Sequence, residues 1–465
     1  MRSKSSVRLA AAAAATILLA ACGSSGSGTD STYLDGPAGA IAIDGSAPKV
    51  VATRYGQNYW CWNGYGNHMP RIQSLVGPLG LDLLRTGGYN NDAEKSTGGY
   101  GTDPFGEDQL DTFVAYARAV GAEPIIQVPL IGNYKKHAAT GKADPADAAA
   151  LVTHANVTHD HRVKYWEIGN EPDLYAAADV PGYTREQFFA DFNAFSSAMK
   201  AVDPSIQILG PELSWKYYPT QPKNSANDWL TPFIEQCKGS YDVIAIHRYP
   251  FDAAHSTIPN AMEDVESYVG FVRSIQALIA SEAPGVPFAI TEANITWDGD
   301  PSHSIYDASP QTIFAAIWLA DNLAASREEG LWAQHFWSLS ESWTLGFVDP
   351  STSRPRPEYH AFQMVSANMG PTELATAPPA GFSVYASRNA ADDTTVVLVL
   401  NKHATNDAET FVFSGMSGTP AADFTATFPA YSISVVTFPD GGGTPTIYRY
   451  SGQEAAAGSG PIRVQ

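Results

Sequence analysis

The sequence is poor in cysteine, in basic side chains and in long apolar runs. Only 3 of its 465 residues are cysteine, and none of them lies in the closely spaced pairs of a thiolate metal site. The 28 Lys and Arg residues are outnumbered by 48 Asp and Glu, for a formal charge of −20. Because nucleic-acid binding needs clustered Lys and Arg, and no cluster is present, nucleic acid is excluded as a partner. No apolar run after residue 22 approaches the ~18 residues of a membrane helix, which predicts a soluble body.

Residues 1–22 have the form of an export signal. Basic residues come first, residues 9–21 are apolar but too short to cross a bilayer, and Leu-Ala-Ala-Cys ends the segment at Cys22. This ending resembles the lipobox of bacterial lipoproteins, which implies cleavage before Cys22 and acylation of that residue. Residues 23–30 then form a flexible Gly/Ser tether. We expect a lipid-anchored protein of the bacterial cell envelope, periplasmic or at the cell surface, or otherwise a secreted protein without lipid.

Between residues 50 and 370 one unit recurs: a short apolar run, a polar or Gly-rich loop, and a longer helical pattern. The spacing of the runs is close to that of βα units in a decorated barrel. This predicts the α/β class, with a (β/α)8 TIM barrel favoured over an open doubly wound sheet. The eight runs are 50–53, 81–85, 124–128, 164–168, 206–209, 243–247, 288–292 and 333–337.

Beyond residue 370 the sequence pattern changes to short runs of strand-forming residues separated by turn residues. Residues 371–440, with 31–49 lent from the N-terminal side of the barrel, are predicted to form a second, smaller all-β sandwich domain. The Gly- and Ala-rich segment 441–465 is predicted to be a tail, in which residues 446–450 could form one more strand.

Two carboxylates end two of the barrel runs. Glu171 follows the run at 164–168, and Glu292 ends the run at 288–292, 121 residues later. Barrel active sites are built from the carboxyl ends of the strands, so the two acids are expected to meet. Glycoside hydrolysis needs one acid to protonate the leaving oxygen and another to attack the anomeric carbon or activate water. We therefore assign Glu171 as general acid/base and Glu292 as nucleophile of an O-glycoside hydrolase acting on oligo- or polysaccharides. Carboxyl groups ~5–5.5 Å apart would mean retention of configuration, and ~6.5–9.5 Å would mean inversion.

Polar and aromatic side chains at the other strand ends are expected to bind the sugar. Arg85 and Tyr249 would donate hydrogen bonds to Glu292 and keep it ionised. Asn170 would bind the sugar 2-hydroxyl, and His247 would orient the acid or bind hydroxyls. Because an aromatic face stacks on a pyranose ring, tryptophans that follow strand ends are expected to form sugar platforms. These are Trp337, Trp215 and Trp297, with Trp60 and Trp62 as further candidates.

No cofactor and no metal is required by this chemistry. His154, His159 and His161 precede the fourth run, and their spacing fits a solvated helix-to-loop segment better than a ligand set. Cys61 and Cys237 allow either a disulfide or two buried thiols, and sequence does not decide between them.

Four motifs together resemble the signature of clan A glycoside hydrolases: Trp-Glu-Ile-Gly-Asn-Glu-Pro at 166–172, Ile-Thr-Glu-Ala-Asn at 290–294, Ala-Ile-His-Arg-Tyr at 245–249 and Leu-Arg-Thr-Gly-Gly at 84–88. The resemblance covers about 50–370. It implies that Glu171, after Asn170 on strand four, is the acid/base, that Glu292 on strand seven is the nucleophile, and that configuration is retained.

Shorter stretches are similar to different families within that clan. Residues 169–175 are similar to the bacterial β-glucuronidase and heparanase family, and 121–126 with 163–166 to the α-L-arabinofuranosidases. Residues 337–339 with 356–362 are similar to the β-xylosidase family and to the endoglucanase/xyloglucanase family with a sandwich tail. The sugar, the linkage, endo or exo action and the oligomeric state therefore stay open.

Two alternatives share the same barrel. One is a lipid-anchored, non-catalytic carbohydrate-binding protein on a decayed hydrolase fold, against which the presence of Glu171, Glu292 and Asn170 argues. The other is a transglycosylase that passes through the same covalent intermediate.

Overall fold

The computed structural model describes residues 39–59, 65–88, 106–133, 138–139, 144–178, 180–299, 307–341, 344–389, 393–416 and 424–465. The signal segment, the tether, Cys22, Cys61, Trp60 and Trp62 lie outside these residues. Cys237 is a buried free thiol.

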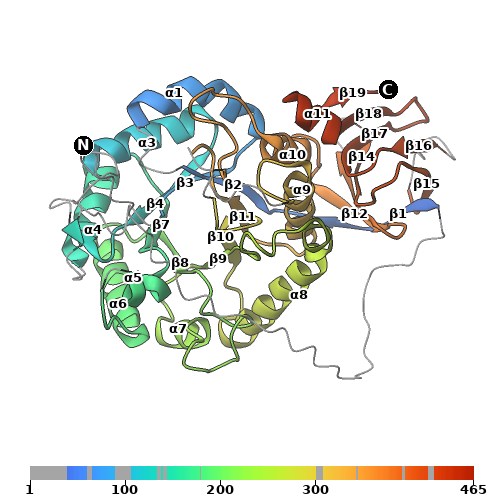
Figure 1. Ribbon diagram of the computed structural model, residues 1–465. Helices are drawn as coiled ribbons and strands as arrows, with labels where there is room; N and C mark the ends of the chain where they lie inside the picture. The colour runs from blue at the N-terminus through green and yellow to red at the C-terminus, as the bar shows by residue number, and fades with distance from the viewer. Residues whose placement is uncertain are drawn as a thin grey trace, which may run out of the picture.

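Eight parallel strands close into a barrel with helices around it (Figure 1). The ring runs β10-β11-β2-β3-β4-β7-β8-β9, and β2 pairs with both β11 and β3. This confirms the predicted (β/α)8 class and excludes the open sheet. The strands are β2 Arg54–Tyr59, β3 Leu83–Thr86, β4 Glu123–Val128, β7 Tyr165–Ile168, β8 Gln207–Leu213, β9 Val243–Arg248, β10 Phe288–Ala293 and β11 Ala333–Phe336.

The first barrel strand lies four residues later than its sequence pattern indicated. The apolar pair Val50-Val51 suggested a strand at 50–53, but Val50 ends β1 and is exposed. The barrel strand β2 is instead the polar segment RYGQNY, five of whose six residues are buried. The sequence pattern did not indicate this strand because its residues are polar. They are polar because the strand lines the polar end of the barrel, which is described below.

Helices cover the barrel, and several begin at a threonine cap. Thr184, Thr257 and Thr312 each accept a hydrogen bond from the backbone N–H three residues on, at 3.1, 3.4 and 3.3 Å. Among the described helices none combines the length and apolar character needed to cross a bilayer. The helices are α1 Tyr65–Val76, η2 Gly77–Leu79, α3 Glu107–Ala119, α4 Pro145–Val152, the π-helix η3 Thr153–Thr158, η4 Pro172–Leu174, α5 Tyr175–Ala178, α6 Arg185–Val202, α7 Leu230–Gln236, α8 Ile258–Glu282, α9 Ile313–Glu328 and α10 Pro357–Ser366.

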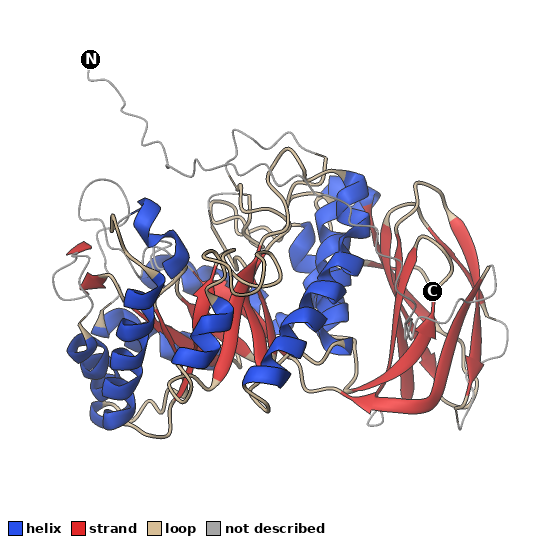
Figure 2. Ribbon diagram, turned by 90° about the horizontal axis from the view of Figure 1, so that it is seen from below, coloured by secondary structure: helices blue, strands red, loops and turns tan. Residues whose placement is uncertain are grey.

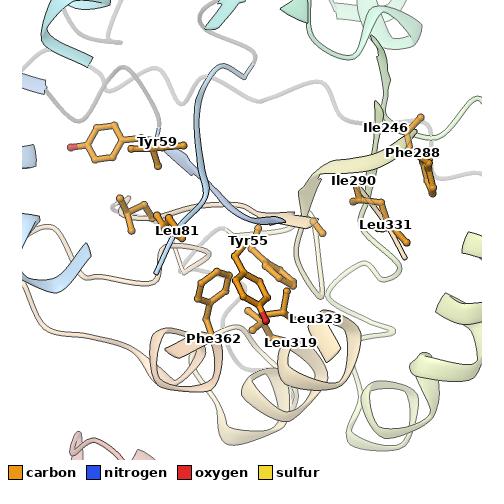
Figure 3. Packing of buried hydrophobic residues seen from close by; sticks show 14 of the residues in the cluster. Tyr55, Tyr59, Leu81, Ile246, Phe288, Ile290, Leu319, Leu323, Leu331 and Phe362 are labelled. Atoms are coloured by element: carbon orange, nitrogen blue, oxygen red, sulfur yellow. The ribbon is translucent and has the colours of Figure 1, made fainter. Parts of the chain in front are cut away.

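The main hydrophobic core lies between the barrel strands and the helices. In Figure 3, Tyr55 of β2 lies beside Phe362 of α10 and beside Leu319 and Leu323 of α9. The rings of Tyr55 and Phe362 meet edge to face, with centroids 6.1 Å apart. This contact joins the first barrel strand to the last two helices of the barrel.

Inside the barrel, the side chains change from apolar to polar along each strand. Inward positions alternate along a strand, so residues two apart share the interior. At the amino end a small cluster of Leu83, Ile125, Tyr165, Leu209, Val243, Ala245, Ala289 and Ala333 fills the interior. Two residues further along five of these strands, the buried residues are Arg85, Gln127, Glu167, His247 and His335. The carboxyl end of the barrel is therefore a buried, charged layer supported by an apolar plug.

The C-terminal part is a nine-stranded mixed sheet that curls around its own core (Figure 2). Its strand order is β16-β15-β1-β12-β13-β14-β17-β18-β19. Strand β1 pairs in parallel with β15 and antiparallel with β12, so a segment that precedes the barrel completes a sheet that follows it. The strands are β1 Ala40–Val50, β12 Thr372–Ala377, β13 Phe382–Asn389, β14 Thr394–Asn401, β15 Asp407–Ser414, β16 Thr425–Phe428, β17 Ser432–Pro439, β18 Thr446–Ser451 and β19 Ile462–Arg463.

The segment 441–465 is more ordered than the tail predicted for it, and β18 lies where the sequence allowed one more strand, at 446–450. It contains β18, the helix α11 Gly452–Ala457 and β19, and β18 pairs with β17 over six residues. Ser451 caps α11 in a capping box with Glu454, which orders a stretch whose composition alone reads as loose.

Buried polar contacts join the sheet to the barrel. Asp321 of α9 accepts hydrogen bonds from Ser383 at 3.0 Å, Tyr385 at 2.6 Å and Lys402 at 3.1 Å, all on or beside β13 and β14. Because these groups are directional and buried, they fix how the sheet sits on the barrel.

Candidate active site

Arg85 is the centre of the charged layer, and each nitrogen of its guanidinium has a partner. Nε donates to Glu167 at 2.5 Å, Nη1 to Glu292 at 2.6 Å and Asn58 at 2.9 Å, and Nη2 to Asn170 at 3.0 Å. Burial alone would lower the pKa of Arg85, but the nearby carboxylates outweigh it and raise that pKa. A permanently charged, rigid fork thus holds two acids and the predicted sugar-binding amide in one geometry.

His247 lies among three carboxylates. Its Nδ1 is 3.0 Å from Glu171 Oε1 and 3.5 Å from Glu292 Oε2, and its Nε2 is 3.2 Å from Glu212 Oε2. Burial would lower the pKa of His247, but the charge of Glu292 and the hydrogen bonds to Glu171 and Glu212 raise it to about 10. With a carboxylate oxygen facing both ring nitrogens, the ring is an imidazolium that donates on both sides.

Glu171 and Glu292 face each other across this network. One carboxylate oxygen of each lies within 4.8 Å of the other and of a His247 nitrogen. Glu292 is buried, and its Oε2, the oxygen that faces His247, accepts a hydrogen bond from Tyr249 at 3.0 Å. Burial raises the pKa of Glu171, the hydrogen bond from His247 opposes this, and the charge of Glu292 adds to the rise. Glu171 is therefore the acid of the pair whose proton is held more tightly than usual.

The backbone around the acids is strained. Glu171 and Glu212 have φ of +50° and +55°, in the left-handed region that non-glycine residues rarely adopt. The Glu171 N–H donates to the Glu212 carbonyl at 2.9 Å, which ties the two strand ends together. Gly169 has φ +76°, and a Cβ there would lie 2.6 Å from the Tyr175 hydroxyl. Strain of this kind costs on the order of 1–3 kcal/mol per residue and gathers at functional sites.

The loop after β3 passes close over the site because it contains two glycines. A Cβ on Gly87 would come within 2.9 Å of the Arg85 guanidinium carbon, and one on Gly88, with φ +99°, within 2.6 Å of the Trp337 ring. Trp337 is buried at the end of β11 and its indole N–H donates to Glu341 at 3.2 Å. Burial raises the pKa of Glu341 to about 7.

Trp215 and Trp297 lie on the loops that follow β8 and β10. The Trp215 N–H donates to Asp173 at 3.1 Å, and that buried carboxylate also accepts from Ser214 and Lys216. The Trp297 side chain is 49% exposed. Their role as sugar platforms stays a prediction, since neither ring is tied to the Arg85 network by the contacts described above.

The predicted residues Arg85, Asn170, Glu171, His247, Tyr249 and Glu292 thus lie in one hydrogen-bonded cluster. Glu167 also faces the barrel interior, where it pairs with Arg85. Two members, Asn58 and Thr291, were not predicted as site residues, and the sequence left Glu212 open between a strand-end site residue and a cap or salt-bridge partner. Asn58 was missed because its strand was placed too early. Glu212 lies inside β8, which extends past the predicted end at 209, and Thr291 donates to Glu212 from β10.

Glu171, His247 and Glu292 also satisfy the spacing of metal ligands. An imidazolium has no free lone pair for a metal, however, and the Arg85 cation already binds Glu292. The donor set therefore fits proton transfer better than metal binding.

The His247 ring is expected to keep its second proton to about pH 10. Since its folded-state pKa lies above the ordinary 6.5, the stability it contributes is fully present below pH ~6.5 and is lost as pH rises through about 10. Glu212→Gln should lower this pKa by removing one carboxylate. Ring ¹⁵N NMR of the protein labelled at histidine measures both values; a neutral ring at pH 7 in the unaltered protein would contradict the assignment.

A closed parallel barrel with facing glutamates at the ends of its fourth and seventh strands is the architecture of the clan A glycoside hydrolases. The model of glycosyl hydrolases family 39 matches residues 156–391, and the chain belongs to that family. Among curated proteins, a β-xylosidase from Geobacillus stearothermophilus is 24% identical over 230 residues. That match spans 44% of this chain and 42% of the relative.

Solved structures of related enzymes share the fold at low sequence identity. CelM2, a bifunctional glucanase-xylanase from a metagenome library, superposes with a TM-score of 0.64 at 18% identity, over 87% of this chain and 100% of that chain. An α-L-arabinofuranosidase from Thermotoga maritima gives 0.64 at 16% identity, over 86% and 99%. A β-xylosidase from Caulobacter crescentus gives 0.60 at 16% identity, over 82% and 84%. These similarities establish the arrangement of barrel and sheet.

Proposed function

We propose that this protein is a retaining O-glycoside hydrolase in which Glu171 is the general acid/base and Glu292 the nucleophile. The observation that carries the proposal is the approach of the two carboxylates to within 4.8 Å, oxygen to oxygen. Retaining enzymes hold their acids ~5–5.5 Å apart, whereas inverting enzymes leave ~6.5–9.5 Å for a water molecule. The close approach of the two nearest oxygens supports the shorter, retaining separation.

In the first step, an oxygen of Glu292 forms a bond to the anomeric carbon while the glycosidic C–O bond breaks. The proton of Glu171 moves to the departing oxygen. Arg85 and Tyr249 hold the two Glu292 oxygens, which orients the nucleophile and keeps it charged. Asn170, held by Arg85, is positioned for the sugar 2-hydroxyl.

In the second step, water attacks the anomeric carbon, Glu171 takes its proton, and the bond to Glu292 breaks. The charge of Glu292 is one cause of the raised pKa of Glu171. That charge is neutralised in the ester intermediate, so the pKa of Glu171 falls and the carboxyl group, having given up its proton, stays ionised and can act as the base when a base is needed. His247 stays bound to Glu171 through both steps and keeps its carboxylate aimed at the anomeric carbon.

The substrate is proposed from the relatives. The curated relative is named a β-xylosidase, so aryl β-xylosides come first in a substrate panel, followed by arabinofuranosides, glucuronides, glucosides, galactosides, and β-glucan and xyloglucan polymers. Proton NMR of the first sugar released is expected to show the anomeric configuration of the substrate. A product of opposite configuration would refute double displacement, and a product joined to an added acceptor sugar would indicate transglycosylation.

We further propose that Cys22 carries a lipid that anchors the protein in the bacterial cell envelope. Support comes from the Leu-Ala-Ala-Cys ending of the signal segment and the Gly/Ser tether after it. Mass spectrometry of the mature N-terminal peptide tests this; an unmodified Cys22 would contradict it.

A further inference from the structure

A second cluster of ionisable side chains lies on the outer wall of the barrel. It joins Asp111 of α3 to three histidines that follow α4. Asp111 Oδ1 is 2.9 Å from His154 Nε2 and 2.7 Å from His161 Nε2. The His159 ring lies between the other two, with centroids 4.2 Å from His154 and 5.6 Å from His161. One ligand atom each from Asp111, His159 and His161 lie within 4.8 Å of one another.

The π-helix η3 explains how this spacing becomes a cluster. In an α-helix, residues five apart point ~140° away from each other, because each residue turns the helix by 100°. Here the chain is wound as a π-helix, and the His159 N–H bonds to the His154 carbonyl, five residues back, at 3.1 Å. The wider turn brings the His159 ring next to the His154 ring, with the two planes tilted by 39°. Single π turns of this kind occur frequently at functional sites.

The loop after η3 is fixed so that His161 returns to the same place. The Asn156 side chain donates to the Val163 carbonyl at 2.9 Å and accepts from the Val163 N–H at 2.7 Å, which closes the loop at its base. Arg118 of α3 donates to the His161 carbonyl. Asp160 and Arg162, on either side of His161, both have positive φ.

We propose that Asp111, His154, His159 and His161 form a binding site for a divalent transition-metal ion, Zn²⁺ in particular. Three imidazoles and one carboxylate are the nitrogen and oxygen donors that Zn²⁺ accepts in tetrahedral sites. Ca²⁺ and Mg²⁺ prefer all-oxygen sets and do not fit. A tetrahedral zinc ion separates its ligand atoms by about 3.3 Å, so Asp111, His159 and His161 require only small side-chain movements. His154 lies outside that group of three but bonds Asp111, and it would turn toward the ion to complete the set. The excess of acidic residues over basic ones also favours a cation.

The surroundings supply the outer contact that metal-bound histidines usually have. A histidine bound through Nε2 generally donates its Nδ1–H to a carboxylate or carbonyl. His154 Nδ1 lies 3.8 Å from Glu107 Oε2, one turn of α3 before Asp111. A movement that brings Glu107 within hydrogen-bond distance would hold the ring in the tautomer that exposes Nε2 to the ion.

The bound ion would act as a structural clamp. It would join α3 to the segment that leads directly into β7, the strand before Glu171. Metal binding to a site present in the folded protein stabilises that fold by linkage. The bound ion takes no part in the sugar chemistry, so this proposal can be tested independently of the proposed function.

The test uses the full chain, stripped of metal and titrated with Zn²⁺ by calorimetry and with Co²⁺ by visible absorption. We expect one equivalent at this site, with the ligand-field bands of a tetrahedral ion, and a melting temperature raised by ~3 °C or more. His159→Gln and His161→Gln should each weaken binding at least ~10-fold and remove the thermal shift. His159 is exposed, so its replacement should not disturb folding.

Two matched variants locate the ion. His255→Gln removes a histidine from another surface His–Asp pair, with Asp252 at 2.7 Å, and should bind metal as the unaltered chain does. Glu171→Gln alters the other possible ligand cluster and should also bind normally. The proposal is overturned if the chain takes up no metal, if the His159 and His161 variants bind with unchanged affinity, or if only Glu171→Gln abolishes uptake.

Discussion

Glu292→Ala is expected to lose at least ~10⁴-fold in kcat and to regain turnover when sodium azide is added. The loss follows because the variant lacks the carboxylate that is assigned to form the bond to the anomeric carbon. Recovery follows because the shortened side chain leaves space next to Arg85 and Tyr249, two donors that attract an anion. Azide entering that space attacks from the face that Glu292 occupied, so the glycosyl azide should have the configuration opposite to the substrate.

NMR of the azide adduct formed from an activated aryl glycoside measures this outcome. Glu329→Ala, which removes a carboxylate paired with Arg273 on the surface, serves as the control and should keep full activity. Circular dichroism confirms that each variant is folded. If Glu292→Ala retains activity, or if the azide product has the configuration of the substrate, Glu292 is not the nucleophile.

Glu171→Gln is expected to lose activity to an extent that depends on the leaving group. Substrates with poor leaving groups need the proton and should lose ~10²–10⁴-fold in kcat/KM. A dinitrophenyl glycoside departs without help, so its first step should be nearly normal and the covalent intermediate should accumulate, because the base for the second step is absent. A burst of phenol followed by slow turnover, seen in stopped-flow absorbance, would demonstrate this; equal losses on both substrates would contradict the assignment.

The same variant should change the pH profile. Glu171 must be protonated to act as the acid, and burial raises its pKa. In the unaltered protein, kcat/KM for a poor leaving group should therefore fall as pH rises through that raised pKa, on the alkaline side of the profile. Gln carries no titrating proton, so this alkaline limb should disappear in Glu171→Gln. Persistence of the limb would assign it to another group.

Much of the fold was predictable because the strand pattern of a barrel is local. Seven of the eight apolar runs fall on or next to the observed strands, since buried parallel strands must be apolar on both faces. The exception, β2, is polar because Gly56 and Asn58 face the charged layer; a Cβ at Gly56 would lie 2.1 Å from the His335 ring. A strand that contributes mainly to the site lacks the apolar signal that reveals the others.

The site was predictable wherever a strand end was correctly located. Arg85, Glu171, His247 and Glu292 follow from that rule and lie in one cluster. Glu212 was harder to assign, because its contact with His247 depends on how far β8 extends and on a left-handed backbone. Contacts between side chains on strands that are far apart in the sequence produce no periodic pattern in the sequence.

The histidines before β7 are a second case in which the local sequence pattern does not reveal a spatial cluster. Positions 154, 159 and 161 do not share a face of an α-helix, so a solvated segment was the reasonable interpretation. The π turn and the return of the loop bring them onto Asp111. The local sequence pattern does not predict backbone geometry that departs from the α-helix, such as the π-helix η3.

The position of β1 limits how this chain can be divided. Its residues come before the barrel, yet its neighbours β12 and β15 come after it, so no single cut yields two complete pieces. A fragment beginning at residue 371 would lack β1 and would leave the edges of β12 and β15 unpaired in the middle of the sheet. Unpaired strand edges promote self-association. During synthesis the sheet cannot form until the whole barrel has been made. Strand β1, although it is synthesised first, is therefore among the last strands to be paired on both sides.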